Sequence, residues 1–361
     1  MSEYPRLVVH QDDPLNAEPP LEALCQSPVT PVDLFFIRNH GNMPAVDPAA
    51  YRLSVENTPF PLSLSLEDIQ HRFDKVTVEA TLQCAGNRRH ELTAVQPIPG
   101  ELEWDAAAIS NATWSGARLR DVLLAAGIDP AADQQLFVAF EGLDETERHN
   151  RRIHFGGSIP IDKALCPEVI LAYEMNGAPL TPAHGFPLRI VVPGYIGARN
   201  VKWLSRIMVQ AMPSDNYFQS HAYKLFAPNV TPETVVWDSG LMLGEMSINA
   251  VICWPHNAMA IPAGAIEVRG YAIAGGNRHV ARVDVSVDGG QSWNSADLLG
   301  DARPWTWRFW RALLNLTPGE HKLVVRAVDS AANTQPEDVR SIWNFKGYMN
   351  NAWHRVTVKV T

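Results

Sequence analysis

The residues best suited to chemistry lie in one short stretch, Cys84-Ala85-Gly86-Asn87-Arg88-Arg89. A thiol beside fixed positive charge is biased toward the thiolate, which is the form that binds metals and attacks electrophiles. Arginines this close could also hold an oxyanion through planar, bidentate hydrogen bonds. The small residues between them would let the backbone approach whatever the cysteine binds. A lone thiol would equally fit a small buried apolar residue, so the interpretation depends on the arginines and small residues around it.

A second group of cationic side chains lies farther along the chain. An apolar strand is flanked by His184 and Arg189, and it runs into a glycine-rich loop that carries Arg199 and Lys202. Basic groups around a glycine-rich loop form a natural phosphate cradle. The same pattern would also fit a polar rim on a buried strand, so the segment predicts an anion site without proving one.

A third polar cluster follows the apolar run Asp33-Leu34-Phe35-Phe36-Ile37 and consists of Arg38, Asn39 and His40. Polar residues at the end of a strand are typical of a loop that contacts a ligand. A capped strand end with a surface arginine would show the same pattern.

These stretches resemble the sulfite oxidase family. The run around Cys84 matches the molybdenum-binding signature of that family nearly letter for letter, and residues 36–40 resemble its FxRNH segment. The resemblance covers essentially the whole chain. It implies that the Cys84 thiolate binds molybdenum beside the dithiolene of a molybdopterin, the Mo-molybdopterin cofactor.

The resemblance also implies roles for individual residues. The expected catalytic residues are Cys84, Tyr223, Arg38 and Arg89, with Cys84 as the metal ligand. The expected substrate pocket consists of Arg38, Arg89, Trp104, Tyr223 and Arg355. The expected cofactor contacts are Phe36, Ile37, Arg38, Asn39, His40, Cys84, Asp144, His184, Arg189, Asn200, Val201 and Lys202.

Three of these assignments have alternatives in the sequence itself. Asp144 would also fit a solvated loop acid. Tyr217 competes chemically with Tyr223, because any buried tyrosine needs a partner for its hydroxyl. Arg355 would also fit a surface arginine stacked on a tryptophan. In contrast to Trp104, which is expected in the substrate pocket, we expect Trp114 to pack in the core.

The elements that position these residues suggest two domains in a chain of 361 residues. We expect a molybdopterin-binding catalytic domain over 1–228, beginning with a proline-rich extended arm over 1–32 with a short helix near its end. Short alternating strands after residue 228, with a turn at Asp288-Gly289-Gly290, indicate a second domain over 229–361. The expected fold is therefore α+β: a mixed α/β domain of sulfite oxidase type, followed by an all-β immunoglobulin-like sandwich that dimerises.

Composition excludes several other classes. With 46% hydrophobic and 19% charged residues, the chain is typical of a globular protein. A net charge of −9 argues against a general nucleic-acid binder. The four cysteines show neither metal-ligand nor CxxC spacing. Neither a leader-like N-terminus nor an apolar run long enough for a bilayer is evident, so we expect a cytoplasmic protein without a membrane span.

The resemblance predicts oxidation of sulfite to sulfate, with two electrons passed to an external acceptor, either a cytochrome c-type protein or dioxygen. A homodimer through the C-terminal domain is expected. Alternatives are a molybdenum domain of nitrate reductase type and an oxidase of another small sulfur compound. A non-catalytic immunoglobulin-like binding protein is disfavoured by the intact polar motifs.

Overall fold

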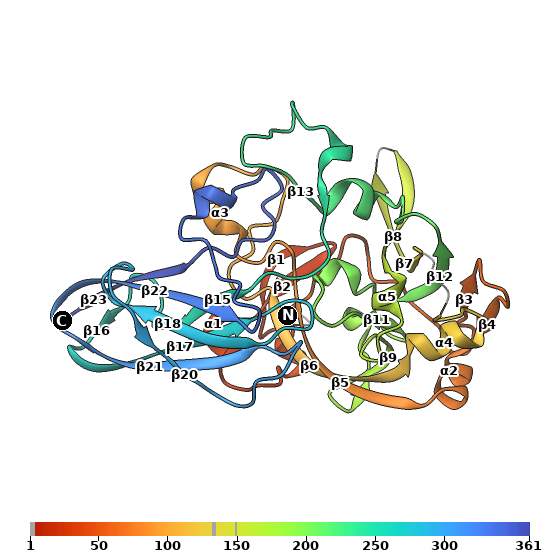
Figure 1. The fold of residues 1–361 in the computed structure, drawn as a ribbon, viewed down its shortest axis with the longest axis horizontal. Helices are drawn as coiled ribbons and strands as arrows, with labels where there is room; N and C mark the ends of the chain where they lie inside the picture. Colours follow the sequence, from red (N-terminus) through yellow and green to blue (C-terminus); the bar gives the residue numbers. More distant parts are fainter. Residues whose placement is uncertain (1–3, 132–134, 149) are drawn as a thin grey trace.

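The computed structural model describes residues 4–131, 135–148 and 150–361 (Figure 1). In Figure 1 the N-terminal half lies on the right and the C-terminal half on the left, with the hairpin of β1 and β2 near the middle. That hairpin comprises β1 (Val8–Asp12) and β2 (Leu15–Glu18). The expected extended arm is therefore folded back on itself by the turn at Asp13 and Pro14 before α1 (Leu21–Leu24).

Two five-stranded sheets form the scaffold of the N-terminal half. The first has the order β10-β9-β6-β5, with β11 also pairing to β9. Its strands are β5 (Lys75–Gln83), β6 (Ile109–Arg118), β9 (Ile170–Met175), β10 (Ala178–Pro179) and β11 (Arg189–Val191). The second has the order β4-β3-β12-β7-β8. Its strands are β3 (Leu53–Glu56), β4 (Leu62–Leu64), β7 (Phe137–Arg148), β8 (Arg151–Pro160) and β12 (Leu204–Gln210).

Short helices fill the connections, and local signals explain where they begin and end. Helix α2 (Leu66–Arg72) begins after a capping box, in which the Ser65 side chain accepts from the Asp68 amide and the Asp68 carboxylate accepts from the Ser65 amide. Helix α4 (Leu119–Ala125) ends before Gly127, whose φ of 86° permits the left-handed turn. Besides α1, the helical segments are α2 (Leu66–Arg72), α3 (Arg89–Val95), α4 (Leu119–Ala125), α5 (Ile161–Ala164), η1 (Val32–Leu34), η2 (Pro182–His184), η3 (Gly197–Arg199), η4 (Phe218–Ala222), η5 (Trp237–Ser239) and η6 (Val339–Ile342).

The C-terminal half consists of two sheets with a shared core. One has the order β15-β17-β21-β20 and the other β16-β23-β22-β18-β19. Alternating apolar residues of both sheets, such as Ile252, Val268, Val285 and Leu323, pack in one cluster. The strands are β15 (Asn249–Trp254), β16 (Ala260–Ile261), β17 (Gly264–Ile273), β18 (Val280–Ser286), β19 (Asn294–Ser295), β20 (Asp297–Leu298), β21 (Arg308–Leu316), β22 (Gly319–Asp329) and β23 (His354–Val360).

The two halves are in contact through a further apolar cluster. It joins Ala85 and Tyr223 to Val251, Tyr271 and Tyr348. The small sheet of β13 (Lys224–Leu225) and β14 (Leu241–Met242) lies in the connection between the halves. Within the described ranges, no helix is long and apolar enough to cross a membrane.

Candidate active site

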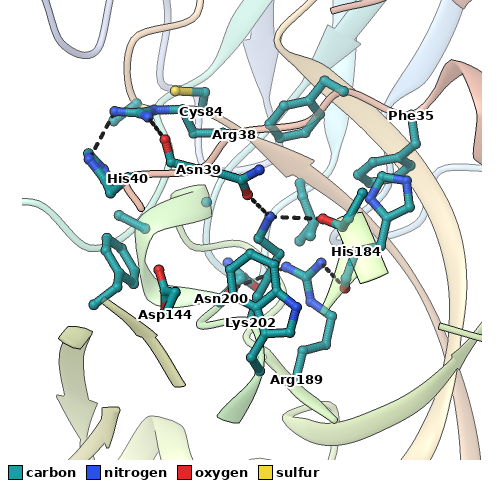
Figure 2. A pocket seen from close by; sticks show the side chains of 18 of the residues that line it. Phe35, Arg38, Asn39, His40, Cys84, Asp144, His184, Arg189, Asn200 and Lys202 are labelled. Carbon is teal, nitrogen blue, oxygen red and sulfur yellow. Dashed lines mark hydrogen bonds between the residues drawn. The ribbon is translucent and has the colours of Figure 1, made fainter. Parts of the chain in front are cut away.

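A cavity opens where segments from distant parts of the N-terminal half meet. Figure 2 shows side chains from these segments pointing into it. Its walls come from the segment after η1, the end of β5 and the corner after it, strands β7 and β8, residues 183–203, and the residue that follows η4. The lining residues are Phe35, Phe36, Arg38, Asn39, His40, Leu82, Cys84, Ala85, Asp144, Phe155, Ala183, His184, Arg189, Gly197, Ala198, Asn200, Lys202, Trp203 and Tyr223.

Cys84 lies in a tight corner directly after β5. Its amide donates to the Ala108 carbonyl at 2.9 Å, and its Sγ accepts from the Gly86 amide at 3.4 Å. The thiol is 5% exposed and faces the cavity. A Cβ at Gly86 would approach Arg89 Nη2 to 2.3 Å, so glycine is required for the arginine to fold back against the corner. The corner thus presents one thiol to the cavity with a guanidinium packed behind it.

The two arginines after this corner have different environments. Arg88 is fully buried and makes a bidentate ion pair with Glu91, with both N–O distances at 2.7 Å. This pairing identifies Arg88 as a structural residue. Arg89 donates to the carbonyls of Gly347 and Leu102 at 3.1 and 2.7 Å. Arg89 therefore lies behind the lining residues of the cavity, close to the Cys84 corner.

Arg38, His40 and Tyr223 form a connected chain of hydrogen bonds on one wall. Arg38 Nη2 lies 3.1 Å from His40 Nδ1, and His40 Nε2 lies 2.8 Å from the Tyr223 hydroxyl. Burial and the Arg38 charge lower the pKa of His40 well below its usual value, so the ring is neutral. Because a guanidinium can only donate, Nδ1 accepts and Nε2 carries the proton. His40 therefore donates to Tyr223, which leaves the tyrosine proton available for a ligand.

The tyrosine itself remains protonated at neutral pH. Burial raises the pKa of Tyr223 to about 12. Its rival Tyr217 stacks on His221 with ring centroids 5.7 Å apart and is absent from the cavity lining given above. The structure therefore places Tyr223, and not Tyr217, on the wall that carries Cys84.

The opposite end of the cavity is cationic. Arg189 is 4% exposed and donates to the carbonyls of His184 and Asn200, both at 3.0 Å. No carboxylate pairs with it in the part of the chain that the structure describes, and burial lowers its pKa to about 9. Lys202 Nζ donates to Asn39 Oδ1 and, at 2.8 Å, to the Ala183 carbonyl (Figure 2).

Two buried polar atoms at this end lack partners. Arg189 Nε and Asp144 Oδ1 make no hydrogen bond to any described residue. Burial raises the pKa of Asp144 to about 6, although Lys202 opposes this. Burial lowers the pKa of His184 to about 3, so that ring is neutral. Buried cationic and polar groups without partners are costly, which indicates that an anionic, hydrogen-bonding group belongs in this cavity.

Most predicted residues line the cavity, and a few lie beside it. Ile37 and Val201 are buried in apolar clusters, and the Val201 carbonyl accepts from the Ile190 amide. Trp104 is fully buried in the cluster that contains Cys84, and its Nε1 has no partner among the described residues. Trp114 packs in the core, as expected, with the Arg189 guanidinium 4.8 Å from its ring centroid.

The predicted place of Arg355 in the substrate pocket is wrong. Residues alternate in β23, and His354 points inward, so Arg355 points to solvent. Its Nη1 donates to the Glu337 and Trp353 carbonyls at 2.8 and 3.1 Å, and its guanidinium lies over Trp353. The alternative of a surface arginine stacked on a tryptophan is what the structure shows.

The C-terminal half instead contributes Lys346, which the sequence interpretation missed. Its Nζ pairs with Glu101, whose carboxylate lies 3.7 Å from Arg89. The charges of Arg89 and Lys346 both help to lower the pKa of His40, so they lie near the hydrogen-bonded wall. The lysine lies only nine residues before Arg355, and tertiary contacts alone distinguish the two.

The donor set fits a metal that arrives with a cofactor. Among the residues described, no group of three or more His, Cys, Asp or Glu side chains could hold a metal ion. Cys84 supplies a single thiolate position at the cavity wall. A dithiolene cofactor would bring the remaining sulfur ligands, and its anionic part would satisfy Arg189 and Lys202.

Comparisons with known proteins agree with this geometry. Residues 40–218 match an oxidoreductase molybdopterin binding domain, and residues 241–361 match a Mo-co oxidoreductase dimerisation domain. The chain is 46% identical to mitochondrial sulfite oxidase of Mus musculus, over 99% of this chain and 66% of that protein. It therefore spans about two thirds of the length of that relative. The solved structure of the sulfane dehydrogenase SoxCD from Paracoccus pantotrophus has a TM-score of 0.82 and 27% identity, covering 98% of this chain and 86% of that one.

Two further relatives bear on the family. Sulfite oxidase of Gallus gallus is 46% identical over 98% of this chain and 78% of that protein. The nitrate reductase of Hordeum vulgare is 38% identical over 96% of this chain but only 41% of that protein. The thiol corner, the cationic cavity and these matches lead to one conclusion. The chain belongs to the sulfite oxidase family of molybdopterin-binding oxidoreductases.

Proposed function

We propose that this protein oxidises sulfite to sulfate at a molybdenum held by Cys84 and passes two electrons to an external acceptor. The observation that carries the proposal is the meeting, in a single cavity, of one buried thiol with Arg189, a buried guanidinium that pairs with no carboxylate among the described residues. The 46% identity to sulfite oxidases over nearly the whole chain supports the choice of substrate.

Each group of residues has a separate task in this proposal. The bound molybdenum cofactor would supply the oxygen-transfer and redox chemistry. Arg189, Lys202 and Asn200 would hold its anionic and hydrogen-bonding parts. Sulfite is a small anion that is costly to bury unless cations compensate its charge, and Arg38 is the cation that lines the cavity for this task.

Tyr223 would orient the bound anion. Its hydroxyl already accepts from His40, so its own proton can be donated to an oxyanion. Arg89 and Lys346 would strengthen the positive potential behind this wall, although Glu101 compensates part of it. The arrangement thus favours an anion at the Cys84 end of the cavity.

The test combines metal content with turnover. Protein from a host that makes the cofactor should contain molybdenum by mass spectrometry and should reduce ferricyanide in the presence of sulfite. Cys84→Ser should abolish this activity even if the pterin is retained, because serine lacks the thiolate ligand. Cys166→Ser is a matched control, since that thiol donates to the Asp162 carbonyl on α5, outside the cavity lining. Wild-type turnover in Cys84→Ser would refute the assignment.

A second candidate substrate is another reduced sulfur compound. The solved structure of a sulfane dehydrogenase, with a TM-score of 0.82 and 27% identity, supports this candidate. Thiosulfate with ferricyanide, and nitrate with reduced viologen, are the assays that separate the alternatives from sulfite. Cytochrome c and dioxygen, offered in turn with sulfite, identify the electron acceptor.

We also propose that the domain boundary lies at 228/229 and that the second domain is an immunoglobulin-like sandwich through which the protein forms a homodimer. Two sheets around one core and the match of residues 241–361 to a dimerisation domain support this. Light scattering on the full chain tests it, since a monomer at micromolar concentration would contradict dimerisation.

A further inference from the structure

Asn16, on strand β2 of the N-terminal hairpin, contacts the wall that carries Arg38. Its side chain is fully buried. Oδ1 accepts from Arg38 Nη1 at 3.1 Å and from the Asn39 amide at 2.8 Å. Nδ2 donates to Gln11 Oε1 at 3.1 Å and to the Pro14 carbonyl at 2.8 Å. Both ends of the amide are therefore engaged, which fixes the orientation of its oxygen toward Arg38.

The hairpin is tied to the same segment by further hydrogen bonds. The backbone groups of Ala17 and Ile37 exchange bonds of 2.9 and 2.8 Å. Asn39 Nδ2 donates to the Leu15 carbonyl at 3.0 Å, while Asn39 Oδ1 accepts from Lys202. The hairpin therefore acts as a neighbouring strand that fixes the backbone on either side of Arg38.

The chemistry of the acceptors around Arg38 is informative. The guanidinium donates to the Asn39 carbonyl, to His40 Nδ1 and to Asn16 Oδ1. All three acceptors are neutral groups, because the pKa of His40 lies well below its usual value. Neutral acceptors fix the orientation of a guanidinium and leave its charge available, whereas a carboxylate would compensate that charge.

We propose that Asn16 is a positioning residue for the substrate anion, holding Arg38 in place as an uncompensated cation. This inference rests on the proposed function and extends its site to a hairpin that precedes the matched region of residues 40–218. Asn16 acts through Arg38 and does not itself line the cavity.

The experiment compares Asn16→Ala, Asn16→Asp and Gln11→Ala as molybdenum-loaded enzymes. Asn16→Ala removes the acceptor and should raise the sulfite KM about tenfold, with kcat within about threefold of wild type. Asn16→Asp keeps an acceptor but places a carboxylate on Arg38, so its KM should also rise about tenfold. Gln11→Ala removes one of the two bonds that orient the amide but keeps the bond to the Pro14 carbonyl, so KM should rise less than in either Asn16 variant.

A second readout does not depend on sulfite turnover. Sulfate should raise the melting temperature of the wild-type holoenzyme, and both Asn16 variants should lose most of that shift while their molybdenum content stays at the wild-type level. If Asn16→Ala fails to fold, Asn16→Asp decides alone. Wild-type KM and wild-type sulfate shift in the folded variants would overturn the inference. An inactive wild-type enzyme whose sulfate shift still depends on Asn16 would instead refute sulfite oxidation.

Discussion

Arg189→Met tests whether the cationic end of the cavity exists to hold an anionic group. Arg189 is buried with no carboxylate partner in the described ranges, and its pKa falls from 12.5 to about 9. That fall corresponds to an ionisation penalty of about 5 kcal/mol. The guanidinium recovers part of it through two hydrogen bonds to carbonyls, each worth about 1.5–3 kcal/mol. Replacement by Met should therefore change the stability of cofactor-free protein by no more than about 2 kcal/mol.

The cofactor-loaded protein should respond differently. Removal of one partner from a buried ion pair costs about 3–5 kcal/mol, which would lower cofactor affinity by a factor of about 10² to 10⁴. Molybdenum content after gel filtration, and melting temperatures of loaded and cofactor-free protein, measure both effects. The control is Arg206→Met, because Arg206 is partly exposed and pairs with Glu56 and Glu141 away from the cavity.

The result that would refute this reasoning is clear. If Arg189→Met retains molybdenum as well as Arg206→Met does, and loses equal stability with and without cofactor, then Arg189 is a structural cation. The inference of an anionic group at this end of the cavity would fall with it.

Two more predictions concern the C-terminal half. Arg355→Ala should leave the sulfite KM unchanged, since that side chain faces solvent. Lys346→Met should raise the sulfite KM about tenfold, because it removes a positive charge beside the wall that carries Tyr223. Equal effects of the two substitutions on KM in steady-state kinetics would contradict this assignment. Burial lowers the pKa of His354 to about 3, so the folded state binds fewer protons than the unfolded one. Stability should then fall by about 2 kcal/mol between pH 7 and 5 from this group alone. His354→Gln should flatten the pH dependence of urea unfolding by that amount, whereas His256→Gln, at a partly exposed ring, serves as the control. An unchanged slope in His354→Gln would show that this ring is protonated in the folded protein.

Much of the site could be predicted from sequence because it is built from short contiguous motifs. The corner at Cys84 and residues 36–40 place several polar groups within a few positions of one another, so their proximity follows from chain connectivity. The choice of Tyr223 over Tyr217 depended on family resemblance, and the hydrogen bond to His40 gives it a physical reason.

Other features could not be read from local pattern. The side of β23 on which Arg355 lies depends on strand register, and a shift of one residue reverses it. The pairing of Lys346 with Glu101 joins positions 245 residues apart. The sequence of the proline-rich arm contains little strand signal, yet the arm forms a hairpin that contacts residues 37–39. Glu18 holds the hairpin from the other side, because its carboxylate accepts from the Asp105 and Ala107 amides at 2.8 and 3.1 Å.

The sequence by itself determined which chemical groups are present and which of them stand side by side along the chain, above all the thiol with its glycine corner. Only the tertiary structure decided which cation of the C-terminal half approaches that corner, and that the N-terminal hairpin holds Arg38. The physical reason is that backbone connectivity sets distances over a few residues. Contacts between distant segments depend instead on strand register and on the satisfaction of buried polar groups.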